Sequence, residues 1–430
     1  MYRTILEDLV RWKNSPRRKP LILSGARQTG KTYILKYFGK KYYKNLVYIN
    51  CENTPLMRDI FKQDYNVDRI ITSLSIISGE KIVKGDTLIF LDEIQEVYGG
   101  LTSLKYFCED APDYHVVVAG SLLGIALNGD TSFPVGKVDM LTLNPMTFSE
   151  FLLACGQESL HQLLLSKDWN TITPLHNRCI ELLRQYYFVG GMPEAVSAFV
   201  ESGDYQEVRT IQTNILTAYK KDFSKHAPKN EIQRIELVLD NIASQLAKEN
   251  KKFIFGALKP GGRAREFEIA IRWLQDCGII QKVCRVKKTE LPLKFYEDVS
   301  AFKLYFCDLG LLGVLMKSPV EQVISGNALF TEYKGAFTEN FCLQQLAADP
   351  RLDVYYYSNE KSTLEIDFLV QKDSEIVPLE VKAEENLKSK SLNSFVSKNP
   401  QCHGLRFSMN PYREQVMLTN VPLYGIGYWF

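Results

Sequence analysis

Residues 25–32 constrain the fold of this chain more than any other part of its sequence. They read Gly25-Ala26-Arg27-Gln28-Thr29-Gly30-Lys31-Thr32, which fits the pattern G-x-x-x-x-G-K-[ST]. The apolar run Leu21–Leu23 precedes them, and the helical pattern Lys31–Phe38 follows. Such a strand–loop–helix unit presents backbone N–H groups and the positive end of a helix to a polyphosphate, and its glycines permit close approach. We therefore expect all eight residues to bind a nucleotide, with Lys31 at the β- and γ-phosphates and the Thr32 hydroxyl as a Mg²⁺ ligand.

A second apolar run ends in two carboxylates, about 60 residues downstream of the loop. Thr87–Leu91 carries no charge and is followed at once by Asp92 and Glu93. In open α/β sheets, residues at the carboxyl ends of the strands line the ligand crevice. We expect Asp92 to hold Mg²⁺ through water and Glu93 to polarise the attacking water. The alternative is a strand that ends in a solvated acidic turn.

The run Val116–Gly120 is typical of a further buried strand, and it leads into the hydroxyl of Ser121. We expect Ser121 to orient the attacking water or to sense the γ-phosphate. The alternative is that Ser121 caps a helix or a turn, as serine often does.

The chain has 430 residues, which is too long for one ordinary core, and the sequence pattern changes along it. Residues 1–145 alternate apolar runs with helical patterns, which predicts a parallel α/β sheet with both faces covered. Residues 146–222 have helical periodicity. Residues 223–318 predict a helix–turn–helix followed by a hairpin with strands at Ile279–Val286 and Leu293–Tyr296. Residues 319–430 predict a helix followed by strands.

Composition narrows the class of protein. The nine cysteines are scattered singly and no C-x-x-C is present, which is typical of reduced thiols in a cytoplasmic protein. The first ten residues include Glu7 and Asp8 and have no apolar secretion segment, and no apolar run is long enough to span a membrane. The formal net charge is +2, so any nucleic-acid surface must be a local patch.

Together these segments resemble the AAA+ branch of the P-loop ATPases. More narrowly, the chain is similar to a prokaryotic family in which an AAA ATPase is joined to a C-terminal domain of unknown function with a nuclease-like fold. The resemblance covers nearly the whole chain and is carried by residues 25–32, 91–95, 119–121, 143–151, 187–195 and the last hundred residues.

The resemblance implies a fold class, cofactors and partners. The fold is α/β, with a P-loop ATPase core at 1–145, a helical lid at 146–222, a winged helix at 223–318 and a PD-(D/E)xK nuclease-like domain at 319–430. It implies ATP rather than GTP, with Mg²⁺, and no guanine-specific N-K-x-D motif is present. Relatives of this kind include both rings and monomers, so a homo-oligomer stays one alternative.

Two short motifs in the resemblance concern the nucleotide. Gly191-Met192-Pro193 matches a G-x-P motif whose proline packs near the adenine in related ATPases, which makes Pro193 a candidate nucleotide contact. A helix that starts with proline at its first position fits the same residues. Gly136-Lys137 stands where relatives have Gly-Arg. Because lysine lacks the bidentate fork of arginine, this departure puts an arginine-finger role at Lys137 in doubt.

Basic residues gather in the predicted winged helix, in the second helix and in the hairpin that follows: Lys259, Arg263, Arg265, Arg272, Lys282, Arg285, Lys287 and Lys288. A recognition helix with a basic hairpin is a common DNA-binding arrangement. Glu266, Glu268 and Asp276 interrupt the positive face, so a packing or regulatory module is the alternative.

Carboxylates and a lysine recur in the last hundred residues. Asp367 lies near the start of one predicted strand, and Glu380 and Lys382 share one face of the next. These three match the D…ExK core of the nuclease-like family, and Glu339 matches its helical acid. Glu339, Asp367 and Glu380 are candidate ligands of a second Mg²⁺ or Mn²⁺, with Asp367, Glu380 and Lys382 as catalytic candidates. The alternative is an inherited fold without turnover.

The sequence thus predicts a Mg²⁺-dependent ATPase whose nucleotide state controls a DNA-binding, nuclease-like region. A nucleotide-dependent switch that binds DNA or protein without cleaving it is the main alternative. In a third alternative, the C-terminal domain only binds a partner.

Overall fold

The computed structural model describes residues 1–120, 133–248, 251–325, 331–359, 364–383 and 389–430. The chain divides into two compact units. The first consists of residues 1–144 with 276–279, and the second of residues 145–275 with 280–430.

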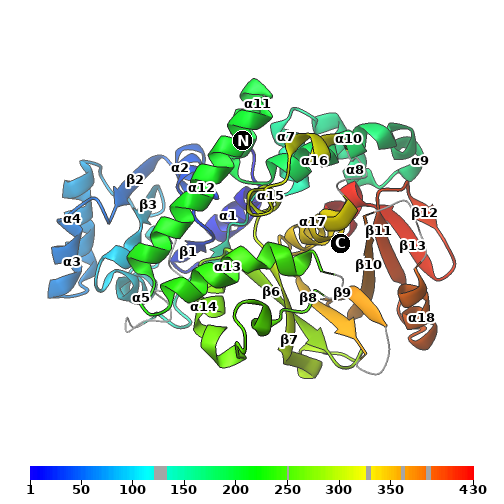
Figure 1. The fold of residues 1–430 in the computed structure, drawn as a ribbon. Coiled ribbons are helices and arrows are strands. Elements are labelled where there is room, and N and C mark those ends of the chain that lie inside the picture. The colour runs from blue at the N-terminus through cyan, green and yellow to red at the C-terminus, as the bar shows by residue number, and fades with distance from the viewer. Residues whose placement is uncertain (121–132, 249–250, 326–330, 360–363, 384–388) are drawn as a thin grey trace. The chain divides into compact units, whose positions relative to one another are not determined.

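The first unit is built on a five-stranded sheet with the order β2-β3-β4-β1-β5, in which every neighbouring pair is parallel (Figure 1). Its strands are β1 (Leu21–Ser24), β2 (Asn45–Asn50), β3 (Thr87–Asp92), β4 (His115–Ala119) and β5 (Asp139–Thr142). Strands β3 and β4 are buried along their whole length, because continuous apolar runs suit a sheet that is covered on both faces. The predicted parallel α/β core is confirmed.

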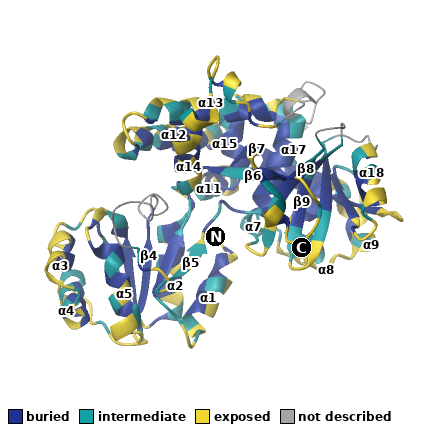
Figure 2. Ribbon diagram, turned by 90° about the horizontal axis from the view of Figure 1, so that it is seen from below, coloured by how far each residue is buried: buried dark blue, intermediate teal, exposed yellow. Residues whose placement is uncertain are grey.

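Helices cover both faces of this sheet. They are α1 (Ile5–Asn14), α2 (Lys31–Tyr42), α3 (Met57–Gln63), α4 (Val67–Ser78) and α5 (Gly100–Asp110). Alternate strand residues point to opposite faces. Ile89 and Leu91 therefore pack with α3, α4 and α5, whereas Leu88 and Phe90 pack with α1 and α2. Figure 2 shows the buried strands between the two helical layers.

The second unit begins with helices. They are α7 (Phe148–Ala154), α8 (Glu158–Ser166), α9 (Trp169–Ile172), α10 (His176–Val189), α11 (Pro193–Ser202), α12 (Tyr205–His226), α13 (Ile232–Leu246) and α14 (Ala264–Asp276). Helix α7 starts with a capping box between Thr147 and Glu150. The helical periodicity predicted after residue 146 is confirmed. None of the helices within the described ranges is long and apolar enough to cross a membrane.

An eight-stranded mixed sheet organises the rest of the second unit, with the order β12-β13-β11-β10-β9-β8-β6-β7. Its strands are β6 (Ile280–Val286), β7 (Glu297–Phe306), β8 (Leu352–Ser358), β9 (Glu365–Lys372), β10 (Glu375–Lys382), β11 (Gly404–Ser408), β12 (Arg413–Glu414) and β13 (Leu418–Pro422). The accompanying helices are α15 (Leu309–Leu315), α16 (Val320–Ser325), α17 (Thr331–Leu346), α18 (Lys390–Lys398) and α19 (Ile426–Trp429).

The predicted hairpin after α14 is wrong in its second strand. Leu293–Tyr296 is a 3₁₀ turn, and β6 pairs instead with the longer strand β7. Pro292 directly before the turn has no N–H to donate to a ladder, whereas Ala301–Phe306 of β7 is a buried run that a central partner can cover. Strand β6 also pairs in parallel with β8, so this hairpin continues into the C-terminal sheet.

Candidate nucleotide site and the C-terminal acidic cluster

The loop at residues 25–32 has the backbone conformations that its glycines allow. Gly25 follows β1 with φ +138°, and a Cβ there would lie 2.3 Å from the carbonyl oxygen of Leu143. Gln28 has φ 63°, and Gly30 has φ 92° as the residue that precedes α2. Successive residues of mixed handedness form backbone nests that bind anions, and here the nest opens at a helix N-terminus.

Lys31 lies folded against this loop. Its Nζ donates to the carbonyl oxygens of Gly25 (2.8 Å) and Ala26 (2.7 Å). Burial lowers the pKa of Lys31 to about 8, although the nearby carboxylates of Glu93 and Asp92 partly oppose this effect. A buried cation that donates its hydrogen bonds to neutral carbonyls is stabilised further when a polyphosphate binds.

Thr32 and Asp92 are brought together from two elements that are 60 residues apart in sequence. The Thr32 hydroxyl, in the first turn of α2, donates to Asp92 Oδ2 at 2.9 Å. Tyr48 in β2 donates its hydroxyl to the same oxygen at 3.2 Å. Burial raises the pKa of Asp92, and the negative charge of Glu93 adds to this, whereas both hydrogen bonds oppose it. A hydroxyl beside a carboxylate is a donor set that fits Mg²⁺.

Glu93 stands where β3 turns away from the sheet. Its φ is +52°, its N–H donates to the carbonyl of Ala119 at 2.7 Å, and Gln95 donates to its carboxylate. The register places Asp92 beside Ala119, the last residue of β4. Ser121 lies just beyond that strand and outside the described residues, so its predicted role stays a prediction.

Two residues that contact the nucleotide loop or Asp92 were not predicted from the sequence. Tyr48 is one. It lies two residues before the end of β2, the strand next to β3, and this position is the signal that could have found it. The other is Arg3, whose buried guanidinium donates to the carbonyl oxygens of Thr29 (2.9 Å) and Asn144. Arg3 thus joins the nucleotide loop to the segment after β5. No pattern around a single arginine at position 3 indicates this.

The Gly191-Met192-Pro193 motif lies in the second unit, and its backbone is tightly held. The N–H of Gly191 donates to Asp308 Oδ2 at 2.5 Å, and its carbonyl accepts from Met146 N–H at 2.7 Å. A Cβ on Gly191 would lie 2.1 Å from the Met146 carbonyl oxygen. Pro193 occupies the first turn of α11, as expected for a helix start. Its contact with adenine stays a prediction.

In the C-terminal region, Glu339 and Asp367 lie in one buried, lysine-rich cluster. Glu339 accepts from Lys251 Nζ and from the Tyr305 hydroxyl, the latter at 3.1 Å. Asp367 Oδ2 accepts the N–H of Val381 at 2.8 Å. Burial raises the pKa of Asp367 to about 7, and the charge of Glu339 adds to this. The positive charges of Lys251 and Lys303 oppose this rise in pKa, so they partly balance the carboxylates in this part of the sheet.

Glu380 and Lys382 lie on the next strand, β10. Lys382 Nζ is 2.8 Å from Glu380 Oε1, so the two share a face as the spacing predicted. Among the side chains that the structure describes, no three His, Cys, Asp or Glu residues form a group that could hold a metal. The metal roles of Glu339, Asp367 and Glu380, and the catalytic roles of Asp367, Glu380 and Lys382, stay predictions.

Some of the basic residues expected to meet DNA already have intramolecular partners. Arg285 is buried and paired with Asp298 at 2.5 Å, and Lys287 Nζ is 3.9 Å from the same carboxylate. Lys282 Nζ lies 4.3 Å from the ring centroid of Phe302. A guanidinium that is already buried against a carboxylate is a poor phosphate contact, so a DNA surface would have to rely on other residues of the set.

Three family models match separate parts of the chain. An AAA domain matches residues 17–152, a domain of unknown function (DUF8612) matches residues 180–322, and a second domain of unknown function (DUF4143) matches residues 334–425. No curated protein matches the chain.

Several solved structures are similar to this one. The Walker-type ATPase PABY2304 of Pyrococcus abyssi has a TM-score of 0.45 at 15% identity, over 72% of this chain and 95% of that one. The Aeropyrum pernix ORC1 protein in complex with DNA has a TM-score of 0.30 at 14% identity, over 74% and 91%. The Thermotoga maritima RuvB Holliday junction branch migration motor has a TM-score of 0.30 at 12% identity, over 67% and 89%. The AAA domain match over residues 17–152 and the geometry of the loop at residues 25–32 agree, so this part of the chain is similar to AAA-type P-loop domains.

Proposed function

We propose that this chain binds ATP and hydrolyses it in a Mg²⁺-dependent reaction at residues 25–32, Asp92 and Glu93. The observation that carries the proposal is the 2.9 Å hydrogen bond between Thr32 and Asp92. It joins the hydroxyl at the start of α2 to the carboxylate at the end of β3, next to a buried lysine.

Each residue has a role that its position supports. The backbone of residues 25–30 holds the phosphates, and Lys31 exchanges its two carbonyl partners for β- and γ-phosphate oxygens. Thr32 and Asp92 would hold Mg²⁺, which supplies positive charge to the phosphate oxygens when it is bound. Glu93 accepts a hydrogen bond from the attacking water and orients it for in-line attack.

An ATPase assay with and without Mg²⁺ tests this proposal. We expect Lys31→Ala to abolish turnover, and Glu93→Gln to bind ATP but hydrolyse it at least about 100-fold more slowly. Lys40→Ala, at an exposed position on the same helix, is the matched control and should be neutral. Turnover that persists in Lys31→Ala, or that is unchanged by EDTA, contradicts the assignment.

We further propose that the nucleotide state controls the C-terminal region. A buried hydrogen-bond network around Asp308 in the second unit supports this link. Asp308 holds Gly191 of the Gly-Met-Pro motif and also caps α15 through Leu311 N–H at 2.9 Å. Gln344 of α17 donates to the Tyr186 hydroxyl at 2.9 Å and lies 3.4 Å from Asp308 Oδ2. The same helix, α17, carries Glu339, so a shift of the motif would be passed to the acidic cluster.

The C-terminal region has two candidate activities, a metal-dependent DNA nuclease and a DNA-binding or protein-binding switch without cleavage. The pairing of Glu339 with Lys251 favours the switch, because the lysine ammonium already supplies the positive charge that a metal ion would bring to this carboxylate. The switch predicts DNA affinity that differs between ATP and ADP, with no cleavage products.

A DNA assay with Mg²⁺ or Mn²⁺ on linear, single-stranded and branched substrates separates the two activities. Cleavage that disappears in Asp367→Ala and Lys382→Ala establishes the nuclease and overturns the switch. Asp353→Ala, on the neighbouring strand β8, is the matched control. Nucleotide-dependent retention without products supports the switch, and the absence of both removes DNA as the partner.

A homo-oligomer belongs to the same proposal. Lys137 pairs with Glu109 at 2.8 Å in its own chain, so an arginine would have to come from elsewhere. Specific ATPase activity that rises with protein concentration supports a second copy, and activity that does not depend on concentration contradicts it.

A further inference from the structure

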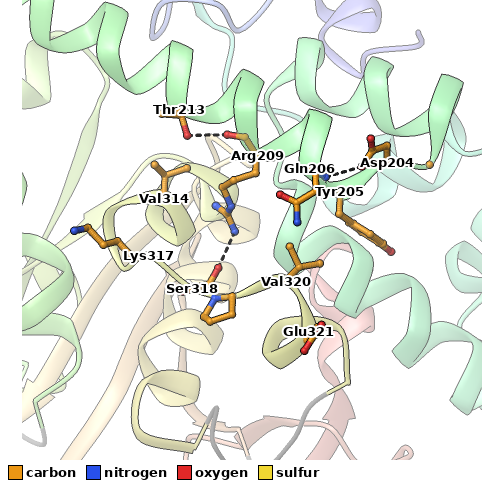
Figure 3. Close-up of a pocket in the computed structure, with 12 residues that line it drawn as sticks. Asp204, Tyr205, Gln206, Arg209, Thr213, Val314, Lys317, Ser318, Val320 and Glu321 are labelled. Atoms are coloured by element: carbon orange, nitrogen blue, oxygen red, sulfur yellow. Dashed lines mark hydrogen bonds between the residues drawn. The ribbon is translucent and has the colours of Figure 1, made fainter.

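A cavity of about 920 Å³ opens in the second unit, and none of the residues that line it has a role in the sites described above. It lies between the turn that joins α11 to α12 and the segment that joins α15 to α16. Figure 3 shows the guanidinium of Arg209, from α12, reaching toward the segment that holds Ser318. Val314, Pro319 and Val320 form an apolar wall beside it.

Arg209 carries a charge that the surrounding protein does not neutralise. Its guanidinium lies 4.3 Å from the ring centroid of Phe188, and the residue is partly buried. Within the described ranges it donates only to carbonyl oxygens, at 3.4 Å to Gly310 and 3.3 Å to Ser318. None of the ion pairs between described residues includes Arg209. Burial lowers the pKa of Arg209 to about 10, so the side chain is still a cation at neutral pH. A shielded guanidinium favours an oxyanion that can accept two parallel N–H bonds.

Ser318 provides a second polar group whose hydrogen-bonding capacity is unused. Its side chain is only 5% exposed, and its hydroxyl has no hydrogen-bond partner among the described residues. Lys317 directly before it has φ +51°, which is uncommon for a residue other than glycine. The Ser318 N–H closes the end of α15 on the carbonyl of Gly313 at 3.0 Å, which fixes the serine in place. A buried hydroxyl of this kind is costly unless something bonds to it.

The acidic residues at this cavity do not cancel Arg209. The carboxylate of Asp204 is used as the cap of α12, where it accepts Gln206 N–H at 2.7 Å. Glu321 lies on the opposite side of the cavity from α12 in Figure 3. The cavity therefore combines the guanidinium of Arg209, the unbonded hydroxyl of Ser318 and an apolar wall, with Lys317 as a further lining residue.

We propose that this cavity binds a small ligand with a single oxyanion group on a short apolar body, either a carboxylate or a phosphate monoester. The guanidinium of Arg209 binds the oxyanion through two N–H groups, and the Ser318 hydroxyl donates a third hydrogen bond. The apolar body packs against Val314, Pro319 and Val320. The site does not depend on nucleotide binding at residues 25–32.

Titration calorimetry on the full chain tests this site with three probes of one shape, which are n-butyl phosphate, pentanoate and n-butanol. Because the nucleotide loop also binds phosphate, each titration is repeated in Lys31→Ala. We expect one or both acids to bind equally well in Lys31→Ala and n-butanol not to bind. The acid that binds more tightly identifies the source of the oxyanion.

Variants at the cavity decide whether the binding belongs there. Arg209→Met keeps the contact with the Phe188 ring but removes the charge, and should weaken binding at least tenfold. Arg178→Met, an exposed arginine of the same unit, is the matched control and should have no effect. Val320→Asp places a competing carboxylate in the wall without disturbing Arg209, so it tests the site even if Arg209→Met fails to fold, and it should abolish binding. The proposal is overturned if neither acid binds, if butanol binds as tightly as the acids, or if Val320→Asp binds normally.

Discussion

Asp308 offers a direct test of how the second unit is held together. Its carboxylate is fully buried and accepts the N–H groups of Gly191 at 2.5 Å and Leu311 at 2.9 Å. Burial raises the pKa of Asp308, so these hydrogen bonds only partly offset the cost of desolvating the charge. In Asp308→Ala both N–H groups lose their acceptor in a region closed to water. Each orphaned donor costs about 1–3 kcal/mol, so the variant should lose about 2–6 kcal/mol of unfolding free energy.

Two further variants provide reference values for this loss of unfolding free energy. Asp308→Asn keeps one acceptor oxygen but turns an amide N–H toward the second donor, so it should lose about 1–3 kcal/mol. Asp204→Ala removes a helix-capping aspartate from an exposed position in the same unit, and its cost should be about 1 kcal/mol.

The assay is equilibrium urea denaturation followed by tryptophan fluorescence. Trp169, Trp273 and Trp429 lie in the second unit, whereas Trp12 lies in the first, so the signal reports mainly on the unit that is tested. The reasoning is refuted if Asp308→Ala costs no more than Asp204→Ala.

Three further predictions concern the first unit. Gly25→Ala places a methyl group 2.3 Å from the Leu143 carbonyl oxygen, so fluorescent-ATP binding should be lost; binding within twofold of wild type would contradict the packing argument. Arg3→Ala frees the carbonyl of Thr29, and we expect about tenfold weaker ATP binding with little change in the circular dichroism spectrum; unchanged affinity would show that Arg3 only supports the fold. Burial, helped by the positive charges of Arg18 and Lys13, lowers the pKa of His115 to about 4, so between pH 6.5 and 4 the unfolded chain takes up a proton that the folded chain refuses. The contribution of His115 to the free energy of unfolding should therefore be fully present above pH 6.5 and should fall by up to about 3 kcal/mol toward pH 4. His115→Gln should remove most of this pH dependence. An equal pH dependence in the variant would show that other groups cause it.

Local patterns predicted much of the fold because they record local physical requirements. The uninterrupted apolar run of β3 indicated burial on both faces, and Gly25 and Gly30 indicated a loop with unusual backbone angles. The two neighbouring strands that carry Asp367 and Glu380 were also predicted, and they are observed as β9 and β10. The hairpin after α14 was predicted wrongly at Leu293–Tyr296, because strand pairing depends on which distant run can cover a neighbour.

By itself, the sequence determined the nucleotide loop, the acidic end of β3 and the class of the first unit. In each, the chemistry depends on residues that are adjacent in the chain, and so their spacing records it. Only the tertiary structure decided that Arg3 and Tyr48 support the nucleotide site, that Asp308 holds Gly191, and that Lys251 neutralises Glu339. These contacts join residues separated by 26 to 117 positions, and a single arginine, tyrosine or aspartate leaves no periodic signal in a sequence. The cavity around Arg209 was likewise not predicted, because a partly buried charge without a counter-charge can be recognised only when every possible partner has been placed in space.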